Sequence, residues 1–237
     1  MFAMARQDAQ VLEESYAGFQ FQLLNFIGAA KQIGDGGPQA YLAGVPLGQK
    51  VASHFHPVDQ FQVFFGSDGA YFERHAINRL HVQYADAYTP YGPFGAGDTE
   101  LRFFTLRPRS TDQHHTMPGA RDKLVGPRGR SVQASLQNTG VYAEPVSTKT
   151  IFAPSPHGMA AYQLQLAAGQ SMVAPSPHGS GGQYIIVTDG SMQCRAGSFP
   201  YQSCLFLGAD DPPLQLSAPA SGGCEVLVLQ YRRPAQP

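Results

Sequence analysis

The sequence GQKVASHFHPVDQFQVFFG, residues 48–66, contains two histidines separated by a single residue. A β-strand turns alternate side chains to the same face, so His54 and His56 point in one direction if this segment is extended. Gln60 has the same parity and joins them beyond a short bend at Pro57. Two imidazoles and one oxygen donor that converge inside a barrel suit a divalent transition metal.

Short candidate strands lie on both sides of this stretch. The chain has 237 residues, with 26 Gly, 19 Pro and 14% charged residues, which favours strands and tight turns over helices. Strands separated by such turns indicate an all-β sandwich or barrel. Residues 5–15 are interpreted either as a short helix or as a loose arm. Candidate strands are 19–24, 40–45, 60–65, 80–84 and 101–106 in the first half, and 150–152, 161–166, 184–187, 204–207 and 225–231 in the second.

The order of residues in 48–66 resembles the first sequence motif of the cupin superfamily. Gly48, His54 and His56 fit that motif, Gln60 stands where the family has a glutamate, and Gly66 arrives one residue early. The resemblance implies a double-stranded β-helix, the RmlC-like jelly-roll barrel of cupins. Because the strand pattern resumes in the second half, we expect two cupin lobes in tandem, as in a bicupin.

The second cupin motif has its best counterpart just before candidate strand 101–106. This alignment puts Tyr91 where the family has its last histidine ligand. The resemblance therefore implies a degenerate metal site made of His54, His56, Gln60 and Tyr91. The ion would be a divalent transition metal, and the residues do not distinguish Fe, Mn, Ni and Zn.

Tyr91 is also the candidate catalytic residue, because a His–Tyr pair can serve as general base and acid without a metal. His75 and His81 are alternative ligands. For both, a hydrogen-bonded strand histidine is the simpler interpretation.

The expected lobes are residues 1–107, with the site, and residues 131–237. Residues 108–130 are polar, basic and without strand periodicity, which indicates a linker or long loop. Its pair His114 and His115 is expected to face solvent.

The second lobe matches the cupin motifs weakly. His178, Gln183 and Gly190 suit the family's second histidine, acidic position and glycine, but Ser176 occupies the first histidine position. One histidine and one glutamine hold a transition metal poorly, so we expect a structural role for this lobe.

Odd-numbered residues near the motif form an apolar face that includes Phe61, Val63 and Phe65. If the even-numbered side lines the barrel, this face needs another cover, either the other lobe or a partner subunit. We therefore predict a homodimer.

The net charge of −1 and the pI of about 6.7 favour neither a nucleic acid nor a membrane surface as partner. Three cysteines without close spacing argue against a disulfide scaffold. The N-terminus lacks the long apolar region of a signal peptide, and no apolar run reaches the ~18 residues of a membrane span. We expect a cytoplasmic protein with a small-molecule substrate.

Three functions follow from these residues and the resemblance. The first is a metal-dependent enzyme that acts on a small organic molecule, with dioxygenase, isomerase or lyase chemistry. The second is a metal-free isomerase with a His–Tyr acid–base pair. The third is a non-catalytic module for small-molecule binding or sensing, because half of the expected ligands are changed.

Overall fold

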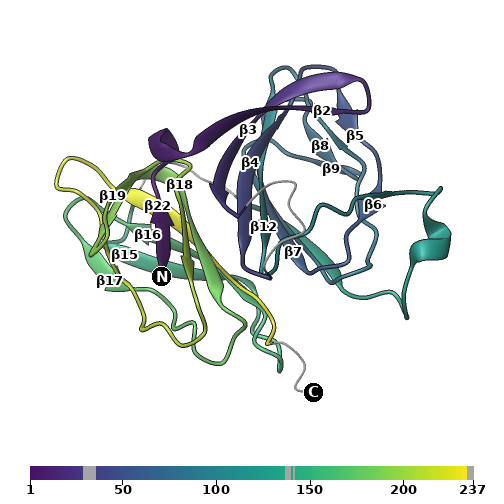
Figure 1. The fold of residues 1–237 in the computed structure, drawn as a ribbon. Coiled ribbons are helices and arrows are strands. Elements are labelled where there is room, and N and C mark those ends of the chain that lie inside the picture. The colour runs from purple at the N-terminus through teal and green to yellow at the C-terminus, as the bar shows by residue number, and fades with distance from the viewer. Residues whose placement is uncertain (29–35, 137–139, 141, 234–237) are drawn as a thin grey trace. The chain divides into compact units, whose positions relative to one another are not determined.

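The structure is a computed structural model that describes residues 1–28, 36–136, 140 and 142–233. The described chain is all-β apart from two 3-10 turns, Arg6–Asp8 (η1) and Arg121–Lys123 (η2), so the predicted class is confirmed. The chain forms two compact units: an N-terminal unit, Gln10–Gln137, and a C-terminal unit that combines Met1–Ala9 with Asn138–Pro237. In Figure 1 the strands of each unit curve around that unit's own interior.

The N-terminal unit contains a seven-stranded antiparallel sheet in the order β14-β10-β7-β12-β4-β3-β2. A four-stranded sheet, β5-β11-β8-β9, and the pair β13-β6 complete it. Its strands are β2 (Gln10–Tyr16), β3 (Phe19–Ile27), β4 (Gln39–Val45), β5 (Lys50–Val51), β6 (His54–Phe55), β7 (Gln60–Phe65), β8 (Tyr71–Phe72), β9 (His75–Ala76), β10 (Leu80–Ala85), β11 (Phe94–Gly95), β12 (Leu101–Arg107), β13 (His115–Thr116) and β14 (Ser131–Leu136).

Strand β7 lies at the centre of this sheet, between β10 and β12. Phe64 on its inner face packs against the rings of Phe72, Phe94 and Phe103, with centroid distances of 5.3, 5.0 and 5.5 Å. Because side chains alternate along a strand, Gln60 and Gln62 also point inward. The aromatic cluster thus fills one end of the interior and leaves polar side chains at the other.

Two glycines of the motif segment are required by the backbone. Gly48 has φ +72°, a left-handed conformation that allows the turn into β5. Gly66 ends β7 against the backbone of Ile77, and a Cβ at this position would lie 2.2 Å from the Ile77 carbonyl oxygen.

The predicted unit boundaries differ from the observed ones. Residues 108–130, interpreted as a linker, supply β13 and η2 to the N-terminal unit, and β14 pairs with β10 along its full length. The candidate helix over 5–15 is instead the turn η1 followed by strand β2. The partners of β13 and β14 are distant in sequence, whereas β2 forms a hairpin with the next strand, β3. Side-chain periodicity within a segment does not reveal which strand it pairs with.

The C-terminal unit is built on one nine-stranded sheet with the path β1-β20-β18-β22-β16-β15. Strand β19 pairs with β18, and β21 pairs with β17 and β18. The strands are β1 (Phe2–Met4), β15 (Val146–Phe152), β16 (Ala160–Leu166), β17 (Ser171–Val173), β18 (Gln183–Cys194), β19 (Gly197–Pro200), β20 (Cys204–Leu207), β21 (Gln215–Ser217) and β22 (Cys224–Gln230).

Apolar side chains fill the interior of the C-terminal unit. Ile185 and Val187 of β18 and Val226 and Val228 of β22 are fully buried in one cluster. This packing is typical of a structural core, because burial of each such side chain contributes about 1.5–3 kcal/mol.

The apolar face of β7 is also buried. Phe61 and Val63 have no exposed surface within the single chain. This burial removes the argument for a partner subunit that the sequence drew from this face, and the homodimer stays a prediction. No helix in the described part of the chain is long and apolar enough to cross a membrane.

Candidate metal centre

Three strand-like segments position the candidate site. Strand β6 begins at His54, whose backbone exchanges two hydrogen bonds with Tyr91, each 3.1 Å long. On its other side β6 pairs with β13, which sets His115 opposite Phe55. The same register brings the residue before β13, His114, alongside His56. Segments that are far apart in the sequence therefore meet at β6.

His54, His56 and His114 form one cluster. One ring nitrogen from each imidazole lies within 4.8 Å of the others. The His54 ring stacks on His114 at a centroid distance of 4.1 Å and lies 5.2 Å from the His56 ring. Both residues of the His-x-His pair are buried, with exposed fractions of 3% and 7%, and His114 is the least buried of the three.

Backbone carbonyls fix the tautomers of the His-x-His pair. The Nδ1 of His54 lies 2.7 Å from the carbonyl oxygen of Ala52, and the Nδ1 of His56 lies 2.5 Å from that of Gln113. A carbonyl oxygen only accepts hydrogen bonds, so each Nδ1 carries the proton and each Nε2 is an acceptor, which in His56 faces Arg107. This is the arrangement in which histidines bind metals, with the second ring nitrogen anchored to the protein.

The imidazoles are held in the neutral form that metal binding requires. Burial, and then the neighbouring His114, lowers the pKa of His54 well below its usual 6.5. Burial, and then the Arg107 guanidinium, lowers the pKa of His56 well below the same value and that of His114 to about 4. Three neutral nitrogen donors suit zinc, copper, iron or nickel ions.

A buried polar layer lies behind the imidazoles. Arg107, 2% exposed, donates hydrogen bonds to the Oε1 atoms of Gln60 (2.8 Å) and Gln39 (2.7 Å) and approaches His56 Nε2 at 3.1 Å. The Nε2 of Gln60 donates to the hydroxyl of Tyr91 at 2.5 Å. A metal on His56 would therefore displace the contact with Arg107, whose remaining bonds keep it in place.

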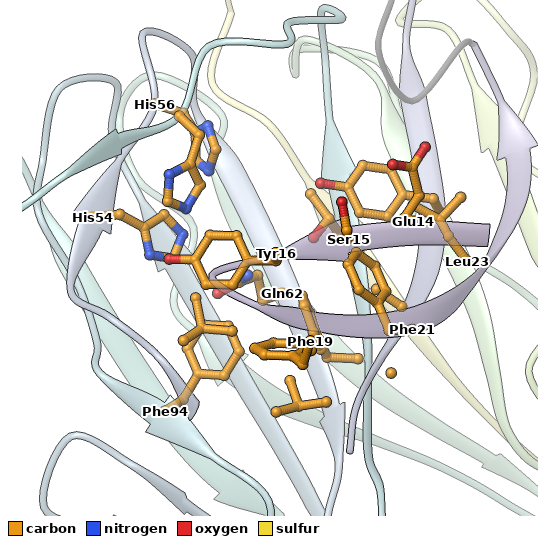
Figure 2. Close-up of a pocket in the computed structure, with 18 of the residues that line it drawn as sticks. Glu14, Ser15, Tyr16, Phe19, Phe21, Leu23, His54, His56, Gln62 and Phe94 are labelled. Carbon is orange, nitrogen blue, oxygen red and sulfur yellow. The ribbon is translucent and has the colours of Figure 1, made fainter. Parts of the chain in front are cut away.

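A cavity of about 220 Å³ opens beside the three histidines. Figure 2 shows Tyr16 and Phe19 of the β2–β3 hairpin extending toward His54 and Phe94, with Gln62 behind them. The Tyr16 ring lies 5.2 Å from that of His114. The walls are mostly apolar, with contributions from Tyr16, Phe19, Phe21, Leu23, Ala43, Val45, Val51, Phe94 and Phe103. The polar members besides the three histidines are Glu14, Ser15, Tyr41, Gln62, Thr105 and Asp112.

The predicted site residues are brought together only in part. His54 and His56 converge as predicted, and Gln60 and Tyr91 lie beside them. The cavity lining contains neither Gln60 nor Tyr91, because both belong to the buried layer. Burial is the main cause that raises the pKa of Tyr91 far above 10, so the phenol is neutral. The ligand and catalytic roles predicted for these two residues stay predictions.

His114 is the residue that the sequence analysis missed. It was expected to face solvent, and its side chain does keep exposed surface, but its ring also joins the cluster and lines the cavity. The only signal in the sequence was that His114 is a potential metal ligand. Its position depends on the pairing of β13 with β6, which lies about sixty residues earlier in the chain.

The other candidate histidines lie elsewhere. The ring of His81 bonds to Ser135 Oγ (3.1 Å) and Gln133 Oε1 (3.0 Å), as expected for a strand histidine, and His75 is exposed on β9. In the C-terminal unit His178 is exposed, whereas Gln183 is buried and accepts a hydrogen bond from Gln230 Nε2 at 2.8 Å. Among the described residues, the cluster around His54 is the one group of metal-binding side chains found.

No family model matches this sequence, and no curated protein matches it. Solved structures do match. Bacterial pirin YhhW from Escherichia coli, in complex with nickel(II), is 12% identical, covers 98% of this chain and 99% of its own, and has a TM-score of 0.63. An S161A variant of oxalate decarboxylase OxdC from Bacillus subtilis is 8% identical, covers 99% and 78%, and scores 0.66. The 7S globulin of Momordica charantia is 12% identical, covers 98% and 84%, and scores 0.58.

These neighbours are cupin-fold proteins, and at such low identity they define the fold alone. The chain has the cupin fold, as its sequence motif suggested. Function must be argued from the site.

Proposed function

We propose that this protein binds a divalent transition metal through His54, His56 and His114 and acts on a small organic molecule in the adjoining cavity. The convergence of three imidazoles, each ring within 4.8 Å of the others through one nitrogen, carries the proposal. The nickel(II) in the structure of bacterial pirin supports metal binding at a site of this fold. Dioxygenase, isomerase and lyase chemistry all remain within this proposal.

The residues of this chain would have distinct roles in such a reaction. The carbonyls of Ala52 and Gln113 orient two imidazoles, and the aromatic walls exclude water from the bound molecule. Arg107 supplies fixed positive charge behind the site, which favours development of negative charge on the substrate. The bound metal would polarise a substrate oxygen or bind dioxygen.

The donor set fits such an ion. Neutral imidazoles are ordinary ligands of zinc, nickel and iron, and three of them leave coordination positions for a substrate. Gln60 is less suited to a place in the set, because it does not line the cavity and both ends of its amide are hydrogen-bonded, to Arg107 and to Tyr91.

A metal-free isomerase and a binding or sensing module are the two alternatives. The isomerase would pair Tyr91 with His54, whose rings lie 4.6 Å apart, but it would also require the substrate to reach Tyr91, which does not line the cavity. The binding or sensing module is supported by the similarity to a 7S globulin, whose name specifies no reaction. Both alternatives require that the protein function without a metal ion.

Metal analysis of protein purified without a histidine tag tests the proposal. We expect about one transition metal ion per chain, lost in His54→Ala and in His56→Ala. His75→Ala is the matched control, since this exposed histidine belongs to the same unit but not to the cluster. Absence of metal after purification and after reconstitution with Ni²⁺, Zn²⁺, Fe²⁺ and Mn²⁺ would reject the proposal and leave the two alternatives.

A further inference from the structure

Gln62 is a polar side chain buried in the wall of the cavity. It is 2% exposed and lines the space beside the histidines, and its Oε1 has no hydrogen-bonding partner among the described residues. Figure 2 shows its side chain between His54 and Phe94 in this view. A buried carbonyl oxygen without a partner is uncommon in proteins and needs an explanation.

The position of Gln62 in the sheet accounts for its isolation. It lies in the middle of β7, directly opposite Gln83 on β10 and Thr105 on β12. Neither the Nε2 nor the Oε1 atom of Gln83 has a hydrogen-bonding partner among the described residues, so the two glutamines do not hydrogen-bond to each other. The sheet therefore presents a polar position in a cavity whose other walls are largely apolar.

The cost of this arrangement points to a ligand. An unsatisfied buried polar group costs about 1–3 kcal/mol, so an apolar residue of similar shape would make a more stable barrel. Gln62 differs from Gln83 in one respect that matters: it faces the cavity. A hydrogen-bond donor on a bound molecule would satisfy its Oε1 and recover this cost on binding.

The size and lining of the cavity restrict that molecule. An apolar cavity of ~150 Å³ in another protein binds benzene, and the space here is about 220 Å³. Phe94, Phe103 and Phe21 line the cavity and offer aromatic surface to an apolar body. One polar group of the molecule would then meet the imidazoles, and a second polar group would meet Gln62.

We propose that Gln62 is a specificity-determining residue, which selects compact, single-ring substrates that carry a hydrogen-bond donor in addition to the group facing the histidines. This inference rests on the proposed function and deepens it. The acceptor atom is Gln62 Oε1, and this second group is a hydroxyl or an N–H group.

Substituted benzohydroxamates test this inference with the metal-loaded protein, because the hydroxamate group anchors to a metal at one end of a single ring. Dissociation constants are measured for the unsubstituted compound and for hydroxyl and methyl derivatives at the meta and para positions. We expect the hydroxyl derivative to bind about three- to tenfold more tightly than its methyl counterpart at one of these positions. In Gln62→Met this preference disappears, whereas the unsubstituted compound binds within twofold of wild type.

Gln83→Met is the matched control. It removes a buried amide of the same size from the neighbouring strand but does not change the cavity wall, so the hydroxyl preference should persist. The inference fails if wild type shows no hydroxyl preference at either position, or if Gln62→Met retains it. If unsubstituted benzohydroxamate does not bind, or binds equally well after metal removal, the proposed function itself fails.

Discussion

Tyr91 and Gln60 support the histidines from the side that faces away from the cavity. The Tyr91 ring packs edge-on to His54 at 4.6 Å, and its hydroxyl accepts the hydrogen bond of Gln60 Nε2. Gln60 in turn accepts from Arg107. This chain of contacts fixes the orientation of His54 and His56 without adding a group to the cavity wall.

Replacement of Tyr91 by phenylalanine tests whether this residue only supports the histidines or also binds the metal. Tyr91→Phe leaves Gln60 Nε2 without its acceptor, and we expect the free energy of unfolding to fall by about 1–2 kcal/mol. Metal affinity, measured by competition with a chromogenic chelator, should stay within threefold of wild type. A loss of tenfold or more would instead make the phenol a metal ligand, as the cupin motif implied.

At the scale of elements, the pairing of β10 with β14 buries a titratable group. His81 is 1% exposed and bonds to Ser135 and Gln133, both on β14, and Gln133 also donates to Glu73 at 3.2 Å. Burial is the main cause that lowers the pKa of His81 to about 4. The pairing of these strands therefore depends on a neutral imidazole.

This burial makes the N-terminal unit sensitive to acid. The unfolded chain binds a proton at His81 near pH 6.5, whereas the folded unit binds it only near pH 4. The contribution of His81 is thus complete above pH 6.5, and about 3 kcal/mol is lost as the pH falls to 4. Urea unfolding between pH 4 and 7 should show a shallower pH dependence for His81→Gln than for wild type. Parallel curves for the two proteins would contradict this role.

The elements were predictable where the pattern is local. Candidate strand 60–65 coincides with β7, because apolar alternation and the glycine at its end are visible in the sequence. The placement of Phe2–Met4 on β20 and of Ser131–Leu136 on β10 was not predicted. Such pairing is set by backbone hydrogen bonds between distant segments, which leave little trace in a short strand's composition.

The site was likewise predictable only where the pattern is local. The His-x-His spacing predicts that two imidazoles share a face, and the structure places them together. His114 could not be found this way, because its segment is irregular and gains its position from the β13–β6 pairing. The isolation of Gln62 depends on which residues oppose it across the sheet, so only the register reveals it.

On the scale of the whole molecule, the two units have different interiors. The N-terminal unit keeps a cavity with three histidines, whereas buried aliphatic side chains occupy the interior of the C-terminal unit. This contrast agrees with a structural role for the second unit. We carry forward the tandem two-lobe arrangement and the homodimer as proposals, to be checked by the structures of the separate units and by sedimentation.

The contrast between the units predicts one metal site per chain, completed by a segment that looks like a linker in the sequence. Titration of metal-free protein with Ni²⁺ or Zn²⁺ should saturate at one ion per chain. His114→Ala should weaken binding at least tenfold, while His115→Ala should bind as wild type does, since His115 packs on Phe55 outside the cluster. Equal affinity in His114→Ala and wild type, or a second ion of similar affinity per chain, would contradict the account.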